Sequence, residues 1–248
     1  MDEIPLKPIF LFADSQLLFW RPHEDPFLNV VRRSIDAVHP KAAYLGASNG
    51  DDPQFYELFT SAMETVSIDQ CRMIPSNPDD AAREFLKEAD VILLAGGDVR
   101  VGWNAILQAK LNETLIDRYA NGAVLIGISA GAMQLGKRAW GGDMPTDETL
   151  FPTLKLVPSV ISVHEDEDWA ALREAVRLSG GTTLGVGIPR GGGIIYYPEH
   201  VMEPIRHAVH EIFLNDEEMS EAILMPGETA GPEIIDRQGV PPDRKILN

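Results

Sequence analysis

The segment VLIGISAGAMQLG, residues 124–136, joins an apolar run to a serine that is surrounded by small residues. Within it, Gly127-Ile128-Ser129-Ala130-Gly131 matches the pattern G-x-S-x-G. This pattern is typical of a sharp turn from strand to helix that holds a serine exposed and strained. A side chain in place of either glycine would collide with the neighbouring strand or helix. The segment therefore predicts a buried strand that ends at Ser129, and a helix whose N-terminal amides face the serine.

The same alternation of apolar runs and amphipathic segments continues along the chain. Apolar runs of strand length are typical of the buried strands of a parallel sheet, and the segments between them have helical length. Such alternation predicts an α/β fold with a mostly parallel sheet covered by helices on both faces. We expect strands at 8–14, 41–47, 90–96, 123–129, 155–163 and 183–189, and helices at 26–38, 53–65, 79–88, 103–120, 130–138, 167–179 and 201–214.

Length and charge limit the classes of protein to consider. The 248 residues, 44% of them hydrophobic, can bury one sizeable core, and we expect a single domain over residues 1–248 with a turn-rich arm at about 226–248. A formal net charge of −17 disfavours a nucleic-acid or anionic-membrane partner. No apolar run reaches 18 residues, so no membrane span is expected.

Cofactor motifs are missing from the sequence. It has no P-loop, no G-x-G-x-x-G after the first strand and no Cys/His spacing for zinc, so we expect neither a cofactor nor a metal. Cys71 is the single cysteine. An intrachain disulfide is therefore excluded, which fits a reducing compartment, and we expect the cytoplasm.

A serine hydroxyl needs a base to act as a nucleophile, and the base is usually histidine. Of the six histidines, His164 directly follows an apolar run and is placed at the carboxyl end of a strand, where reactive groups of parallel sheets gather. The loops at 95–100 and 127–132 fall at the same edge. His207 and His210 are placed on the expected helix at 201–214, where a solvated helix face explains them better than a metal site.

Three acidic residues compete as the carboxylate that orients such a histidine. Asp143 follows the expected helix at 130–138 and lies between Ser129 and His164 in the sequence. Asp147 and Glu148 are close competitors, and spacing does not choose among the three.

These residues, taken in order, resemble a known family. Ser129 in GISAGA, Asp143 in GGDMP and His164 after VPSVISV resemble the serine peptidases of family S51, which include peptidase E and cyanophycinase. LLAGGDVRVGW, LGVGIP and LFADS extend the similarity over roughly residues 8–197. The family looks like a class I glutamine amidotransferase domain with serine in place of cysteine, so the resemblance implies a three-layer α/β/α sandwich.

The resemblance also implies roles for individual residues. Ser129 is expected as nucleophile, His164 as general base and Asp143 as the acid that orients the imidazole. Backbone amides of Gly97 and Ala130 are expected to form the oxyanion hole. The implied partner is a small peptide, cleaved at a peptide or isopeptide bond, with a homodimer left open.

Three further residues are expected at the substrate, and two of them depart from the family pattern. Asp98 lies in the GGD loop. Glu165 stands where members usually have an aromatic residue after the histidine, and Arg190 stands where an acidic residue is common. An arginine cannot hold a substrate amino group, but it can pair bidentately with a carboxylate.

Two other functions compete with the peptidase. An α/β-hydrolase esterase would use the same turn with a late histidine, His207 or His210, as base. A non-catalytic binding module on the same fold would explain the altered residues Glu165 and Arg190.

Overall fold

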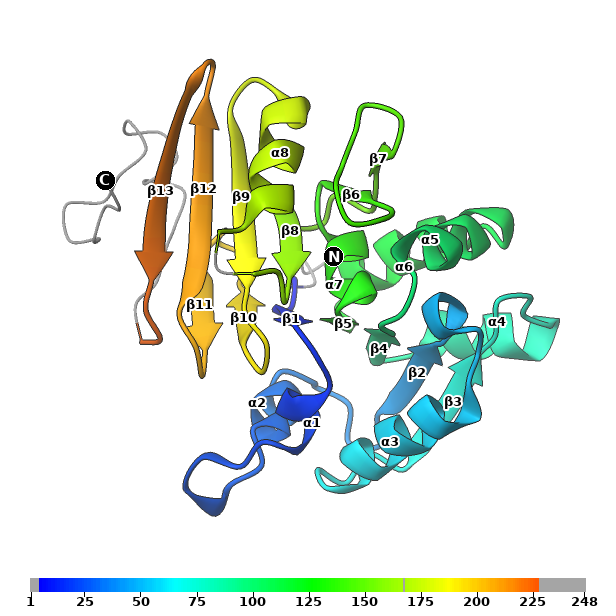
Figure 1. The fold of residues 1–248 in the computed structure, drawn as a ribbon. Helices are drawn as coiled ribbons and strands as arrows, with labels where there is room; N and C mark the ends of the chain where they lie inside the picture. The colour runs from blue at the N-terminus through cyan, green and yellow to red at the C-terminus, as the bar shows by residue number, and fades with distance from the viewer. Residues whose placement is uncertain (1–4, 167, 228–248) are drawn as a thin grey trace.

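The computed structural model describes residues 5–166 and 168–227, which form two larger sheets and the helices around them (Figure 1). The central sheet has seven strands in the order β11-β10-β1-β5-β4-β2-β3. The pairings from β1 through β5, β4 and β2 to β3 are all parallel, whereas the pairings of β1 with β10 and of β10 with β11 are antiparallel. The strand bounds are β1 (Ile9–Phe12), β2 (Lys41–Leu45), β3 (Gln70–Ile74), β4 (Val91–Leu94), β5 (Val124–Ile128), β10 (Gly193–Tyr196) and β11 (Met202–Ile205).

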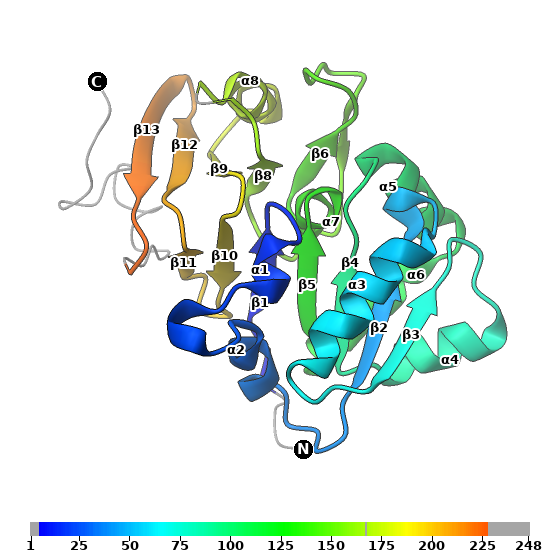
Figure 2. The same cartoon turned by 60° about the horizontal axis from the view of Figure 1, so that its bottom comes forward.

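Alternate side chains of the central strands pack into two separate cores. In β1, Phe10 and Phe12 point to one face and Ile9 and Leu11 to the other, as the two-residue period of a strand requires. The Phe10 face is covered by α1 (Gln16–Phe19), α2 (Leu28–Arg33) and α3 (Pro53–Glu64), which lie in front of the sheet in Figure 2. The Ile9 face is covered by α4 (Asp80–Glu88), α5 (Val99–Gln108), α6 (Leu111–Ala120) and α7 (Ala130–Leu135). The predicted three-layer fold with a mostly parallel sheet is confirmed.

A second sheet, of four strands in the order β13-β12-β9-β8, lies beside α7 (Figure 1). Strands β8 and β9 pair in parallel, and the other two pairings are antiparallel. The short hairpin β6-β7 precedes this sheet in the chain. These elements are β6 (Arg138–Trp140), β7 (Leu150–Pro152), β8 (Val160–Val163), α8 (Ala170–Ser179), β9 (Thr183–Ile188), β12 (Val209–Asn215) and β13 (Glu218–Leu224).

Two of the predicted helices were wrong. Residues 201–214 form β11 and β12, so His207 and His210 do not share a helix face. Pro204 is a poor residue for a helix interior, and the buried run in β12 suits a strand in a sheet. The expected helix at 103–120 is two helices separated at Lys110, whose φ of 55° interrupts the helical path. Most of the expected C-terminal arm, 228–248, lies outside the described residues.

Candidate active site

Ser129 occupies the turn between β5 and α7, as the G-x-S-x-G pattern predicted. Its backbone has φ 49° and ψ −111°, which a residue with a side chain rarely adopts and which costs about 1–3 kcal/mol. The turn is fixed because the Ser129 amide donates to the Phe12 carbonyl of β1 at 2.9 Å. This hydrogen bond therefore holds the strained turn, and with it the hydroxyl, at the end of the sheet.

Both glycines of the pattern are required by close packing. A Cβ on Gly127 would lie 2.7 Å from the Ala132 backbone, and one on Gly131 would lie 2.0 Å from the Leu94 carbonyl oxygen. Real Cβ atoms do not approach backbone atoms this closely. The turn from β5 into α7 can therefore form only with glycine at these two positions.

His164 lies directly beside the serine. It follows β8, and its Nε2 is 3.0 Å from the Ser129 Oγ, which is hydrogen-bonding distance. Its amide donates to the Ile188 carbonyl at 2.8 Å, which ties the residue to the end of β9. The predicted pair of serine and histidine is thus brought together from two different sheets.

The surroundings of His164 favour its neutral form. Burial lowers the pKa of the imidazole, and the positive charge of Arg190 lowers this pKa further. The carboxylate of Asp14 and the histidine's own backbone oppose this by raising the pKa. A neutral imidazole can accept the serine proton, so this environment suits a general base.

The backbone amides expected to form an oxyanion hole flank the serine. Ala130 is the first residue of α7, so its amide has no acceptor within the helix. Gly97 lies on the loop after β4, and within the described residues its amide makes no hydrogen bond. The loop is held by the Asp98 amide, which donates to the Ser48 carbonyl at 2.7 Å. Both free amides line a cavity that contains Ser129.

Asp143 lies on the rim of the same cavity, in the loop between β6 and β7. Its side chain is exposed and, among the described residues, accepts no hydrogen bond from His164. The loop is fastened at its far end, where Arg100 donates to the Thr149 carbonyl at 2.6 Å and its guanidinium lies 3.8 Å from the centre of the Phe151 ring. Orientation of the histidine by Asp143, Asp147 or Glu148 stays a prediction.

A second carboxylate, Asp14, was missed by the sequence analysis. It follows β1 and lines a cavity together with Ser129, His164 and Arg190. Its oxygens accept from the Gln16 amide at 2.9 Å and the Gly191 amide at 2.7 Å, which fix its position. The signal that could have found it is its place at the carboxyl end of a parallel strand, the rule that selected His164.

The three residues expected to bind substrate have different surroundings. Both oxygens of Glu165 are engaged, one by the Ser162 hydroxyl and the other by the Ala171 and Leu172 amides of α8 at 3.0 and 3.3 Å. Glu165 therefore caps α8, and contact between this carboxylate and a substrate stays a prediction. Asp98 caps α5 through one oxygen, by accepting from the Val101 amide at 2.9 Å.

Arg190 has no such internal contact. Its side chain is exposed at the edge of the cavity that contains Asp14, and it forms no hydrogen bond or ion pair with any described residue. The guanidinium is therefore available to an anion from outside the chain.

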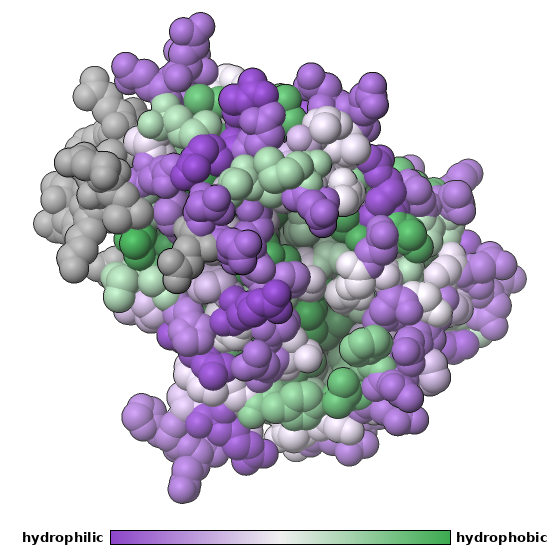
Figure 3. Space-filling model, viewed as in Figure 1, coloured by the Kyte–Doolittle hydropathy of each residue, from purple (hydrophilic) through white to green (hydrophobic). Residues whose placement is uncertain are grey.

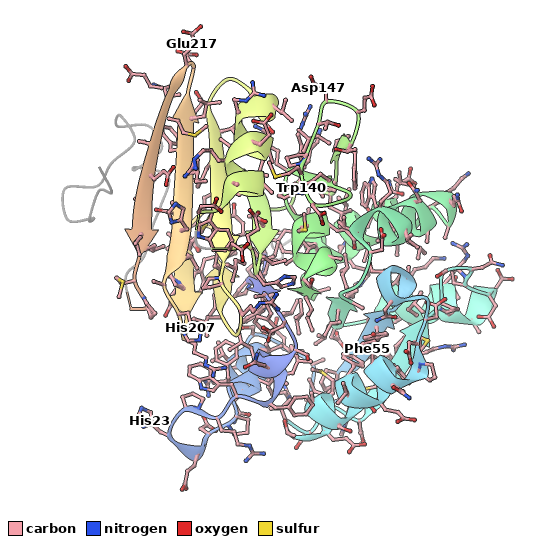
Figure 4. The ribbon with its side chains drawn as sticks, viewed as in Figure 1. His23, Phe55, Trp140, Asp147, His207 and Glu217 are labelled. Atoms are coloured by element: carbon pink, nitrogen blue, oxygen red, sulfur yellow. The ribbon has the colours of Figure 1, made fainter. Side chains whose placement is uncertain are left out.

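Other nucleophiles and bases of the described residues lie elsewhere. His210 pairs with Glu221 at 2.9 Å and stacks on Trp169, and His207 is exposed (Figure 4). The contact between Ser129 and His164 therefore counts against an esterase with a late base. Cys71 lies on the edge strand β3, where burial raises the pKa of its thiol to about 11, so it stays protonated.

The described part of the chain has the features of neither a metal site nor a membrane span. No three of its His, Cys, Asp and Glu side chains gather in a way that could hold a metal ion. None of its helices has the length and apolar character needed to cross a bilayer.

Two cavities open beside the pair of Ser129 and His164. The first, of about 430 Å³, is bordered by Asp98, Trp140, Asp143 and Glu165, and is called here the polar cavity. The second, of about 290 Å³, is lined mainly by side chains of α1, α3 and the central strands, and is called the apolar cavity. Figure 4 labels one lining residue of each, Trp140 and Phe55, and shows them well apart. In Figure 3 apolar surface gathers in a hollow near the position of Phe55.

A strained serine between a parallel strand and a helix, with a histidine at its hydroxyl, defines a nucleophile elbow on an α/β sheet. Comparison with known proteins agrees with this class of site. The family model described as Peptidase family S51 matches residues 24–200, well over half of the chain. The chain therefore belongs to peptidase family S51.

Individual proteins are similar over different extents. The uncharacterized peptidase YgaJ of Bacillus subtilis (strain 168) is 30% identical over 103 residues, which cover 38% of this chain and only 41% of that protein. A peptidase from an acI-B1 actinobacterium has the same fold, with TM-score 0.68 and 14% identity over 92% of this chain and 98% of that one. A putative peptidase E from Listeria monocytogenes EGD-e has TM-score 0.60 and 16% identity over 81% and 98% of the two chains.

Proposed function

We propose that this protein is a serine peptidase that hydrolyses a peptide or isopeptide bond in a small peptide. The observation that carries the proposal is the 3.0 Å contact between the Ser129 Oγ and the His164 Nε2 at a strained turn. Membership of family S51 supports the same chemistry. Cytoplasmic location and a homodimer stay predictions.

The reaction follows from the positions of these groups. His164 takes the proton of the Ser129 hydroxyl while the oxygen attacks the substrate carbonyl carbon. Amides of Gly97 and Ala130 stabilise the negative charge on the carbonyl oxygen. The C–N bond then breaks, and the leaving amine takes the proton from His164. Water, deprotonated by the same imidazole, releases the acyl group and restores the serine.

The acid that supports the imidazole is assigned on electrostatic grounds. The charge of Asp14 acts on His164, and fixed backbone hydrogen bonds hold this carboxylate in place. Asp143 is nearer to solvent and faces the polar cavity. We therefore propose that Asp14 stabilises the imidazolium that forms during the reaction. Asp143 would reach His164 only if the loop between β6 and β7 moved inward.

The acidic rim of the polar cavity indicates which end of a peptide it receives. Asp98 and Asp143 are both exposed there, and the second carboxylate oxygen of Asp98 forms no hydrogen bond with any described group. Carboxylates attract an ammonium group. The polar cavity is proposed to bind the residue with the free amino group.

A fluorophosphonate probe tests the nucleophile. The wild type is expected to be labelled at Ser129, and Ser129→Ala and His164→Ala are expected to lose both labelling and hydrolysis of a dipeptide panel, by at least about 10³-fold in kcat. Ser61→Ala, at an exposed serine of α3, is the matched control and should behave as wild type.

The outcome against the proposal is equally specific. A folded wild-type protein that neither reacts with the probe nor hydrolyses any dipeptide would leave only a binding module. Loss of turnover in His207→Ala or His210→Ala, with full activity in His164→Ala, would instead support the esterase.

A further inference from the structure

The apolar side chains of the apolar cavity take no part in the proposed hydrolysis, yet the cavity opens directly onto the reacting groups. Ser129 and His164 form part of its lining. Most of the remaining wall is hydrocarbon or aromatic ring, contributed by Leu18, Tyr44, Phe55, Leu58, Phe59 and Ile128. A wall of this composition binds apolar groups and not the polar parts of a peptide.

Two of these side chains are exposed without a structural reason. Phe55 is 49% exposed and Leu58 is 43% exposed, and they are three residues apart on α3, hence on one face of the helix. Phe59, on the same helix, is buried and already anchors α3 to the sheet. Large apolar side chains that gather beside a reactive serine indicate a ligand site.

The wall behind these residues is made of packed aromatic rings. Tyr44 packs against Tyr56 and Phe59 with ring centres 5.7 and 5.3 Å apart. The Tyr44 hydroxyl accepts a hydrogen bond from the Asn49 side chain at 2.8 Å. The Tyr44 hydroxyl therefore has a hydrogen-bond partner inside the protein. The aromatic side chains give the cavity an apolar wall in the absence of a ligand.

Arg190 adds a single positive charge at the edge of this cavity. Asp14, the lining carboxylate nearby, already accepts backbone hydrogen bonds, whereas Arg190 has no partner among the described residues. Guanidinium groups bind carboxylates in a bidentate manner. At about 290 Å³ the cavity is near the lower end of ligand pockets, which suits one residue and not a long peptide.

We propose that the apolar cavity is a specificity subsite for the residue on the leaving side of the cut bond. It takes a bulky apolar side chain, and Arg190 binds the free carboxylate of the same residue. The substrate class is then a short peptide that ends in an apolar amino acid, which is released as the leaving amine. This proposal rests on the proposed peptidase function and adds the substrate class.

Dipeptides that share their first residue test the subsite. We expect kcat/KM for Ala-Leu to exceed that for Ala-Gly by at least about tenfold, and Ala-Asp to be the poorest of the three. Leu58→Ser should reduce the ratio of Ala-Leu to Ala-Gly severalfold. Leu107→Ser is the matched control, because Leu107 is 44% exposed on α5 and lines neither cavity, and it should leave the ratio unchanged.

Blocking the carboxylate tests Arg190 separately. Wild type should prefer Ala-Leu to Ala-Leu amide, and Arg190→Gln should treat the two alike. Equal rates for Ala-Leu and Ala-Gly, or a preference for Ala-Asp, would overturn the proposal.

A binding measurement separates failure of the subsite from failure of the peptidase function. Ser129→Ala keeps the whole apolar wall, so calorimetry should show tighter binding of Ala-Leu than of Ala-Gly, and Ser129→Ala/Leu58→Ser should lose the difference. If Ser129→Ala binds Ala-Leu more tightly than Ala-Gly but the wild type hydrolyses no peptide, the subsite proposal is supported and the peptidase proposal is contradicted. If the wild type hydrolyses dipeptides but neither the kinetics nor the calorimetry shows a preference for an apolar second residue, only the subsite proposal is contradicted.

Discussion

The polar and apolar cavities meet at Ser129, but different kinds of structure build them. The polar cavity is walled largely by loops that follow β4, β6 and β8. Helices α1 and α3 and buried strand residues wall the apolar cavity. Loops accept new side chains and movement more easily than packed helices do. Within one active site, the apolar side is therefore the preformed part, and the polar side is the part able to rearrange.

Ser129 and His164, the proposed catalytic pair, line both cavities, and this separates two kinds of variant. A change at Ser129, His164 or the Gly97 amide should reduce turnover of every peptide. A change in one wall should alter the response to one end of the substrate only. The variants that follow test this difference between general effects on turnover and effects on one end of the substrate.

Apart from Ser129 and His164 themselves, the largest effect is expected at Gly97, which lines both cavities. Its φ is 131°, and a Cβ there would lie 2.0 Å from the Ser48 carbonyl oxygen, so Gly97→Ala must displace the loop. Loss of this proposed oxyanion donor should lower kcat by about 10²–10³-fold for all dipeptides alike. Steady-state kinetics on Ala-Leu and Ala-Gly measure the effect.

Gly50→Ala provides the control for backbone strain without a clash. Gly50 has φ 74° and no atom within 4 Å of an added Cβ. Nearly full activity is expected in this variant. If Gly97→Ala retained wild-type kcat, the Gly97 amide would have no part in the oxyanion hole.

A smaller effect, on stability, is expected where the polar cavity meets α8. Glu165→Ala removes the acceptor of two α8 amides, which should lower the free energy of unfolding by about 1–2 kcal/mol. Urea denaturation checks this. Glu174→Ala, at a surface pair with Arg177 on the same helix, should change stability by less than about 0.5 kcal/mol.

Peptide kinetics of the same variant decide between two roles for Glu165. If Glu165 acts only as a helix cap, Glu165→Ala should lose activity equally toward peptides with free and with blocked amino ends. Unchanged stability with a selective loss for free amino ends would make Glu165 a substrate ligand instead.

Sequence patterns brought Ser129 and His164 together as a pair because the physical requirements there are local. G-x-S-x-G specifies a turn in which Gly127 and Gly131 are needed for contact distances, and the structure has that turn. His164 was found by the rule that reactive groups follow parallel strands, and it lies 3.0 Å from the serine. The six expected strands are all present in the structure, although with shorter bounds.

Features that depend on distant packing were beyond the sequence. Strand β12, in the segment expected as a helix at 201–214, acquires its conformation from pairing with β13 and with β9, and no local period in the sequence encodes these pairings. The charge of Asp14 acts on His164 in a fold where β1 pairs with β5, although paired residues such as Phe12 and Ile128 are 116 positions apart in the sequence. The apolar cavity likewise needs α1 and α3 side by side on one face of the sheet.

The smallest expected effect is a shift in the pH dependence of kcat/KM, which reports the pKa of His164 in the free enzyme. The neutral imidazole is the active base, so activity falls as pH drops through this pKa. Arg190→Gln removes a cation that lowers the pKa, and the acidic limb should move to higher pH. Asp14→Asn removes an anion that raises the pKa, and the limb should move to lower pH.

Asp143→Asn is the decisive comparison, because Asp143 belongs to the polar side and Asp14 to the apolar side. With Ala-Leu amide as substrate, loss of the Arg190 contact to a carboxylate cannot confuse the result. The Asp143 variant should keep the wild-type limb, since the charge of Asp14 and not that of Asp143 acts on the imidazole in this structure. The opposite result would be an acidic limb that moves in Asp143→Asn and stays fixed in Asp14→Asn. It would show that the loop between β6 and β7 closes on His164 during turnover, and that Asp143 on the polar side supplies the acid.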